Sequence, residues 1–141
     1  MMARTAGASE AALAAALEKA RTRFSGLAAE LHTGRLAAAK KLSKAVEGEL
    51  GGLGFARVRF SVSVEADESS PARSGVDSVE FLFCPNPGEP PRPLRGTASG
   101  GELSRVLLAL HGVAAAGDTA AWVLDEVDAG IGGVTATAVA G

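Results

Sequence analysis

The feature that most constrains this chain is a seam of apolar residues near its beginning, in which the spacing alternates between four and three positions. The seam consists of Leu13, Leu17, Ala20, Phe24, Leu27 and Leu31. Residues with this spacing line one narrow face of an α-helix, as in a left-handed coiled coil. The seam covers about three heptads, and a helix of an ordinary bundle shows the same stripe. Either interpretation predicts a helix that needs a partner helix along this face.

The helical pattern continues toward residue 50 and then meets a cluster of glycines. Its apolar face there consists of Leu36, Ala39, Leu42, Val46 and Leu50. Lys40, Lys41 and Lys44 lie around this face and are able to meet phosphate, although a charge run on a helix is usually its solvated side. The stretch "GELGGLGF" at 48–55 holds glycines suited to the left-handed conformation of a helix end. The first 50 residues therefore read as one helical arm.

The periodicity changes after residue 55 from helical to alternating. Apolar and polar residues alternate from Val58 to Val64, which predicts a strand with one buried face. A second strand is expected at 78–83, so the two form a hairpin with a long polar connection. The next segment, 84–96, carries five of the six prolines, and we expect no regular structure there.

The stretch "TASGGELSRVLLAL" at 97–110 places a serine and two glycines in front of a leucine-rich helix. One interpretation is a capping box, in which Ser99 accepts from the backbone N–H of Glu102 and the Glu102 side chain reaches back. The other is an anion site, because Gly100 and Gly101 leave the first-turn N–H groups uncovered. The two interpretations do not exclude each other. The buried stripe of the helix is expected to comprise Leu103, Val106, Leu107, Leu110 and Val113.

A short apolar run at 120–124 ends abruptly in Asp125 and Glu126. Such a run is typical of a strand covered on both faces in an α/β sheet, and open α/β sheets bind ligands at the C-terminal ends of their strands. An aspartate there can hold Mg²⁺, and a neighbouring glutamate can orient an attacking water for phosphoryl transfer. The alternative is a solvated turn after a core strand.

Composition narrows the function classes. A net charge of −2 gives no global basic field, so contact with DNA needs a local patch or another part of a larger molecule. Cys84 is the only cysteine, and with His32 and His111 it makes no zinc-like spacing. Glu10 and Glu18 interrupt the alanine-rich start, whose apolar runs fall short of the ~18 residues that span a bilayer. We expect a cytoplasmic protein without a membrane partner.

Four stretches together resemble the C-terminal half of RecN, a family of bacterial ATPases of DNA double-strand-break repair related to SMC proteins. They are "AAAKKLSKAVEGELGGLGF", "EFLFCPNPGEPPRPL", "TASGGELSR" and "VLDEVDAGIGG". The resemblance implies an α/β fold, the C-terminal lobe of a P-loop NTPase head of the ABC and SMC type, with an N-terminal coiled-coil helix and a β-hairpin. It divides the chain into a descending arm and neck at 1–50 and a partial head at 51–141.

The resemblance also implies how the two interpretations of "SGGE" combine. In ABC-type ATPases this element is the signature motif, which contacts the γ-phosphate of ATP bound by the opposite head. Ser99, Gly100, Gly101 and Glu102 would have this role here. The same helix start that Ser99 caps without ATP would receive the phosphate of a partner head, so the implied partner is a second copy of the head.

The element "VLDEVD" resembles the family's Walker B segment. Asp125 would hold Mg²⁺, Glu126 would be the catalytic base, and Asp128 would lie in the segment that reaches across the dimer. No G-x-x-x-x-G-K-[ST] phosphate loop occurs in the sequence, and the family carries it in an N-terminal lobe. The chain alone is therefore expected neither to bind ATP tightly nor to hydrolyse it.

The resemblance implies DNA repair and recombination driven by ATP-dependent head dimerisation, at the nucleoid, with DNA bound by the complete protein. An alternative is a non-enzymatic module that supplies its signature surface to a partner's head. Another SMC or ABC ATPase is a further alternative. A transporter nucleotide-binding domain is disfavoured, because a coiled coil and a hairpin precede the signature here.

Overall fold

The structure is a computed structural model that describes residues 3–55, 57–86, 88–95 and 100–115. Its elements are, in chain order, α1 (Ala3–Gly52), β1 (Arg59–Ala66), β2 (Asp77–Cys84), β3 (Arg92–Pro93) and α2 (Gly100–Ala114). The strands form an antiparallel sheet in the order β1-β2-β3. The described part of the chain is thus a small α/β arrangement, in agreement with the predicted class.

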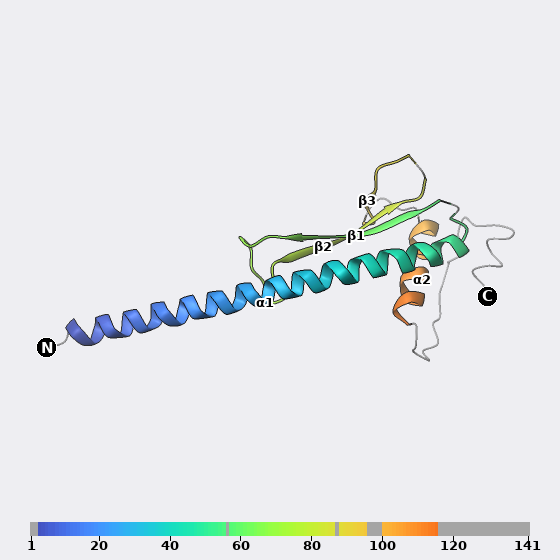
Figure 1. Ribbon diagram of the computed structural model, residues 1–141. Coiled ribbons are helices and arrows are strands. Elements are labelled where there is room, and N and C mark those ends of the chain that lie inside the picture. Colours follow the sequence, from blue (N-terminus) through green and yellow to red (C-terminus); the bar gives the residue numbers. More distant parts are fainter. Residues whose placement is uncertain (1–2, 56, 87, 96–99, 116–141) are drawn as a thin grey trace.

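Helix α1 is a rod of 50 residues whose N-terminal part extends well beyond the rest of the molecule (Figure 1). Gly34 lies within the helix without interrupting it. The helix ends where Gly54 adopts a φ of 86°. Across this turn the N–H of Phe55 donates to the carbonyl of Leu50 at 3.2 Å, the long backbone bond of a Schellman motif. The glycine-rich helix end predicted from the sequence is confirmed.

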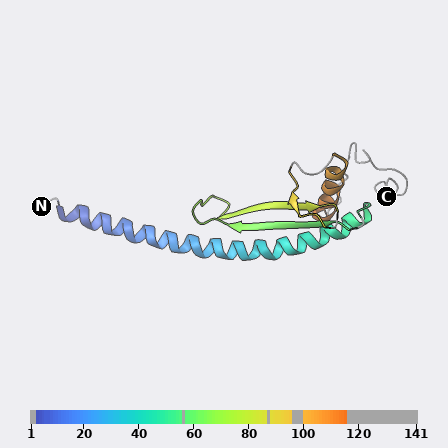
Figure 2. The ribbon, with the colours of Figure 1, turned by 90° about the horizontal axis from the view of Figure 1, so that it is seen from above.

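The apolar seam on the first part of α1 faces solvent. The exposed fractions of Leu13, Leu17 and Leu27 are 68%, 51% and 57%. The sheet and α2 lie beside the C-terminal half of the helix (Figures 1 and 2). Within the described ranges no segment provides a partner for the seam at Leu13 and Leu17, so the coiled coil stays a prediction.

Strands β1 and β2 form the predicted hairpin, and it runs along α1 (Figure 2). Side chains of α1 cover the facing edge of β1. The N–H of Phe60 donates to Glu47 Oε1 at 2.9 Å, and the N–H of Val62 donates to Ser43 Oγ at 3.1 Å. An uncovered strand edge presents unpaired N–H and C=O groups to other chains. Helix α1 therefore protects this edge with two polar side chains.

The expectation that 84–96 holds no regular structure is wrong at two places. Cys84 is the last residue of β2. Strand β3 lies within this segment and pairs Pro93 with Leu82 of β2. The N–H of Leu94 donates to the carbonyl of Phe81 at 2.8 Å. A proline is tolerated there because β3 is an edge strand, where the missing N–H breaks no central ladder.

The core lies where the C-terminal end of α1, the hairpin and α2 meet. Its buried residues are Val46, Leu50, Leu53, Phe55, Phe60, Phe83, Val106 and Ala109. The rings of Phe55 and Phe83 meet edge to face with their centroids 5.6 Å apart, a favourable aromatic geometry. This apolar cluster fixes α2 against the end of the long helix.

Helix α2 packs a different face against the core from the one that the sequence predicts. Val106 and Ala109 are buried, whereas Leu103 and Leu107 remain 36% and 43% exposed. The predicted stripe is therefore wrong at both leucines. The period of 3.6 residues per turn places them to one side of Val106 and Ala109. Leu110 and Val113, which were also predicted, do pack against the core cluster, together with Leu108.

Candidate functional site

The first turn of α2 contains the described part of the predicted ATP-contact motif. Gly100, Gly101 and Glu102 are consecutive residues of that turn. Ser99 lies outside the described residues, and so do Asp125, Glu126 and Asp128 of the predicted Walker B segment. The roles of these four residues therefore stay predictions.

The mouth of α2 is open at its first residue. A Cβ built on Gly100 would meet no atom of the described residues within 4 Å, apart from its chain neighbours and the backbone of its own helix, and the residue is exposed. The first N–H groups of a helix lack partners within the helix and lie at the positive end of its dipole. Glu102 is half-buried in this turn. The geometry of this turn suits the close approach of an anionic ligand.

Two side chains one turn further along hold the carbonyls of the glycines. Ser104 Oγ donates to the Gly100 carbonyl at 3.0 Å, and Arg105 Nε donates to the Gly101 carbonyl at 3.2 Å. Arg105 Nη1 also donates to the Leu53 carbonyl at 3.2 Å, just beyond the end of α1. The guanidinium carbon lies 4.2 Å from the ring centroid of Phe55, within cation–π range.

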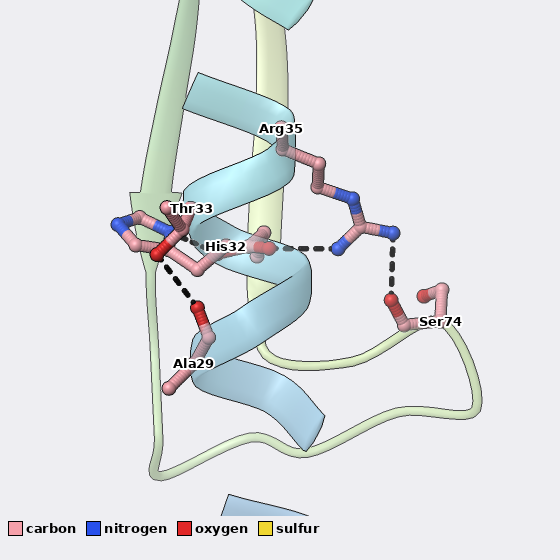
Figure 3. A network of polar contacts seen from close by, with 6 residues as sticks. Ala29, His32, Thr33, Arg35 and Ser74 are labelled. Carbon is pink, nitrogen blue, oxygen red and sulfur yellow. Dashed lines mark hydrogen bonds and ion pairs between the residues drawn. The ribbon is translucent and has the colours of Figure 1, made fainter. Parts of the chain in front are cut away.

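A second polar cluster lies near the middle of α1 and was not predicted from the sequence (Figure 3). Asp77 stands at the start of β2, and its side chain is 1% exposed. Its Oδ1 lies 2.6 Å from His32 Nδ1, and its Oδ2 accepts from Arg35 Nη1 at 2.8 Å. Arg35 Nη2 donates to the Ser74 carbonyl at 2.7 Å. We call these four residues the polar clamp.

The polar clamp fastens the hairpin loop to the long helix. The hydrogen bond from Arg35 is the main cause that lowers the pKa of Asp77 below its ordinary value of 3.8, burial opposes it, and His32 lowers it further. Gly75 sits between, at a φ of 101°, and a side chain there would stand 3.1 Å from Leu31 Cδ2. The loop approaches α1 closely because this residue is a glycine.

The polar clamp could not be predicted from the sequence, because Arg35 and His32 lie 42 and 45 positions before Asp77 and none of the three belongs to a motif. Among the described residues no three histidine, cysteine, aspartate or glutamate side chains gather as a metal site. Cys84 is buried, and its Sγ donates to the carbonyls of Asn86 and Glu89 at 2.9 and 3.2 Å. This cysteine therefore stabilises the loop after β2.

The chain is similar in sequence to several bacterial DNA repair proteins named RecN. The chain is 45% identical over 126 residues to the DNA repair protein RecN of Treponema pallidum, a match of 81% of this chain and 22% of the relative. RecN of Vibrio cholerae is 38% identical over 91% of this chain and 23% of its own length. RecN of Deinococcus radiodurans is 52% identical over 63% of this chain and 15% of its own length.

The matched region is the C-terminal part of each relative, and the chain spans less than a quarter of the length of these proteins. No protein-family model matches the chain. None of the helices in the described ranges is long and apolar enough to cross a membrane. The similarity to RecN that the motifs indicate is confirmed.

Proposed function

We propose, on the premise that this chain is homologous to the C-terminal part of RecN, that it acts in DNA repair as the signature-bearing half of an ATPase head. The observation that supports this proposal is that Gly100, Gly101 and Glu102 form the first turn of α2, with Gly100 exposed, and that Arg105 anchors this helix beside the end of a long helical arm. The coarse role in DNA repair comes from the names of the relatives. ATP-driven head association is the finer part of the proposal.

In this proposal the first turn of α2 receives the γ-phosphate of ATP held by a second head. Gly100 and Gly101 fit such a contact because they leave backbone N–H groups accessible, and the helix dipole favours a negative group there. Ser99 adds a hydroxyl donor, and Glu102 completes the motif. The contact requires two heads to close on each other, which makes ATP part of the interface.

The Walker B segment supplies the chemistry of hydrolysis. Asp125 would hold Mg²⁺, whose charge would offset that of the phosphate oxygens. Glu126 accepts a proton from the attacking water, and Asp128 reaches across the interface. A phosphate loop with its lysine comes from another lobe of the complete protein, because this sequence contains none.

In this proposal the arm and the head have different roles. Residues 1–50 form the descending arm, whose exposed seam at Leu13, Leu17 and Leu27 pairs with another helix. Residues 51–141 form the partial head. DNA contact belongs to the complete protein, since this chain carries a net charge of −2 and no global basic field.

The test is the substitution Glu126→Gln in a full-length RecN that carries this chain as its C-terminal part. The amide keeps the shape and loses the base, so ATP should bind and the heads should close while turnover falls by about 10²-fold or more. ATP binding and steady-state turnover are measured beside wild type. Glu80→Gln, an exposed position on β2, is the matched control. Near-normal turnover of the Glu126→Gln variant would remove the proposed base.

A further inference from the structure

We propose that Arg105 is a positioning residue that holds the first turn of α2 in the orientation needed to receive a partner's phosphate. The inference rests on the proposed function. It starts from one side chain that joins two segments. Arg105 belongs to α2, and its guanidinium contacts the carbonyl of Gly101 in its own helix and Leu53 and Phe55 in the turn just after α1.

The end of α1 creates a place for a cation. The last carbonyls of a helix have no partners within it and lie at the negative end of its dipole. The last turn of α1 contains no basic residue. Arg105 brings a positive charge from the other helix to the Leu53 carbonyl at 3.2 Å. The two helices are thereby joined by charge as well as by the apolar cluster.

The contact at Gly101 transmits this anchoring to the mouth of α2. A peptide unit is planar, so fixing the Gly101 carbonyl also fixes the N–H of the next residue, Glu102, which points the opposite way. In a helix that opposite direction is toward the N-terminal end, where a ligand would approach. Arg105 therefore orients a donor at the helix mouth without touching the ligand itself.

The glycines explain why such a support is needed. Gly100 and Gly101 leave the mouth open, but residues without a Cβ lose the most conformational freedom on ordering. Ser104 and Arg105 each bond the carbonyl four residues back. Of the two, Arg105 also reaches a second element. Donors held in place before the ligand arrives contribute most to transition-state stabilisation.

An arginine suits this position better than a lysine. The contacts use Nε for one carbonyl, Nη1 for another and the planar face of the guanidinium for the Phe55 ring. A lysine keeps the charge but offers a single nitrogen without a planar fork. We therefore predict that Arg105→Lys does not support normal ATP hydrolysis. Because this variant keeps the charge, its loss of turnover would be due to the lost geometry of the contacts.

The experiment uses a full-length RecN with this chain as its C-terminal part, in wild-type form and with Arg105→Lys, Arg105→Ala or Arg92→Ala. Arg92 is exposed on β3 and serves as the matched control. We expect kcat for ATP hydrolysis to fall by about 10-fold to 100-fold in both Arg105 variants, the scale of small misplacements at a reacting centre. The KM for ATP and the melting temperature of Arg105→Lys should stay near wild type, because the nucleotide is held by other residues.

A kcat of Arg105→Lys within twofold of wild type would overturn the inference. So would a loss of turnover that disappears at temperatures well below the melting point of the variant, since that indicates a role in stability alone. The proposed function is tested separately by Glu126→Gln. If Glu126→Gln abolishes turnover while both Arg105 variants turn over normally, the positioning role fails and the proposed function stands.

Discussion

Helix α1 holds the hairpin at two places, and it uses different chemistry at each. At its C-terminal end Val46 and Leu50 pack with Phe60 and Phe83 in the apolar cluster, and all four are 1% exposed or less. Near its middle the polar clamp binds the hairpin loop through the carboxylate of Asp77. The contact at the C-terminal end is thus mainly apolar, with Glu47 and Ser43 bonding the edge of β1 beside it, whereas the contact near the middle is charged.

The difference teaches which contact stabilises the fold and which one sets its geometry. Burial of apolar side chains contributes the larger share, at about 25 cal/mol for each Å² removed from water. A charged pair must first lose its hydration, which offsets much of its attraction. The polar clamp instead fixes the orientation of the hairpin loop relative to α1, because both carboxylate oxygens of Asp77 bond to side chains of this helix. We expect the apolar cluster to provide most of the stability of the hairpin and the polar clamp to fix its orientation relative to α1.

The largest effect is expected at the apolar end. Phe60→Ala removes a ring that is 1% exposed in the centre of the cluster. Removing a buried phenylalanine costs about 3–5 kcal/mol of unfolding free energy, a large part of the stability of a small domain. Chemical unfolding of the chain measures it. Val79→Ala on β2, where the side chain is 50% exposed, should cost only about 0.5 kcal/mol. Equal losses for both variants would contradict the comparison.

A smaller effect, with a pH signature, is expected at the polar clamp. The pKa of Asp77 is lowered in the folded state, first by the hydrogen bond from Arg35. The clamp therefore stabilises the fold above the unfolded pKa of about 4, and this contribution is lost as the pH falls through the lowered folded pKa.

Asp77→Asn should therefore flatten the acid limb of the stability profile between about pH 5 and pH 2. The change should be smaller than that of Phe60→Ala, because His32 and Arg35 are part-exposed and salt screens them. Unfolding is measured at several pH values and two salt concentrations. Asp67→Asn is the comparison variant, because the pKa of Asp67 is lowered only by local bonds to Ser69. An unchanged acid limb in Asp77→Asn would break the distinction between the two contacts.

The sequence predicted the elements of the apolar cluster well, because buried faces of helices and strands produce a periodic pattern of apolar residues. Alternation from Val58 to Val64 indicated β1, and the spacing up to Leu50 indicated the packed face of α1. Glycines marked the helix end at Gly54. These signals are local, since each depends on residues within a few positions of one another.

The sequence did not predict the contacts that join distant segments. The polar clamp joins His32 and Arg35 to Asp77, and the bridge of Arg105 to Leu53 spans 52 positions. Strand β3 depends on the pairing of Pro93 with β2. A polar residue that acts across such a distance leaves no periodic pattern, so only the fold reveals its partner.

The candidate site also has a part that the sequence predicted and a part that it did not predict. The first turn of α2 was expected from "SGGE", and Gly100, Gly101 and Glu102 are there. Its anchoring by Arg105 was not expected, because the pattern gave no partner for this side chain. Ser99 and the acidic residues of the predicted Walker B segment lie outside the described residues, and their roles stay predictions.

The most direct test of the central claim is whether ATP still brings two heads together when Ser99 is replaced by arginine. The substitution Ser99→Arg, made in a full-length RecN that carries this chain, fills the mouth of α2 while the rest of each head remains able to bind ATP. Ser70→Arg in the exposed hairpin loop is the matched control. ATP binding, ATP-dependent association and turnover are measured for both.

We predict that Ser99→Arg binds ATP like wild type but neither associates on adding ATP nor hydrolyses it, whereas Ser70→Arg does both. If Ser99 only caps its helix, replacing it should lower the free energy of unfolding by about 1 kcal/mol and leave turnover unchanged well below the melting point. Near-normal ATP-dependent association and turnover of Ser99→Arg would therefore contradict the account and leave "SGGE" as a helix cap.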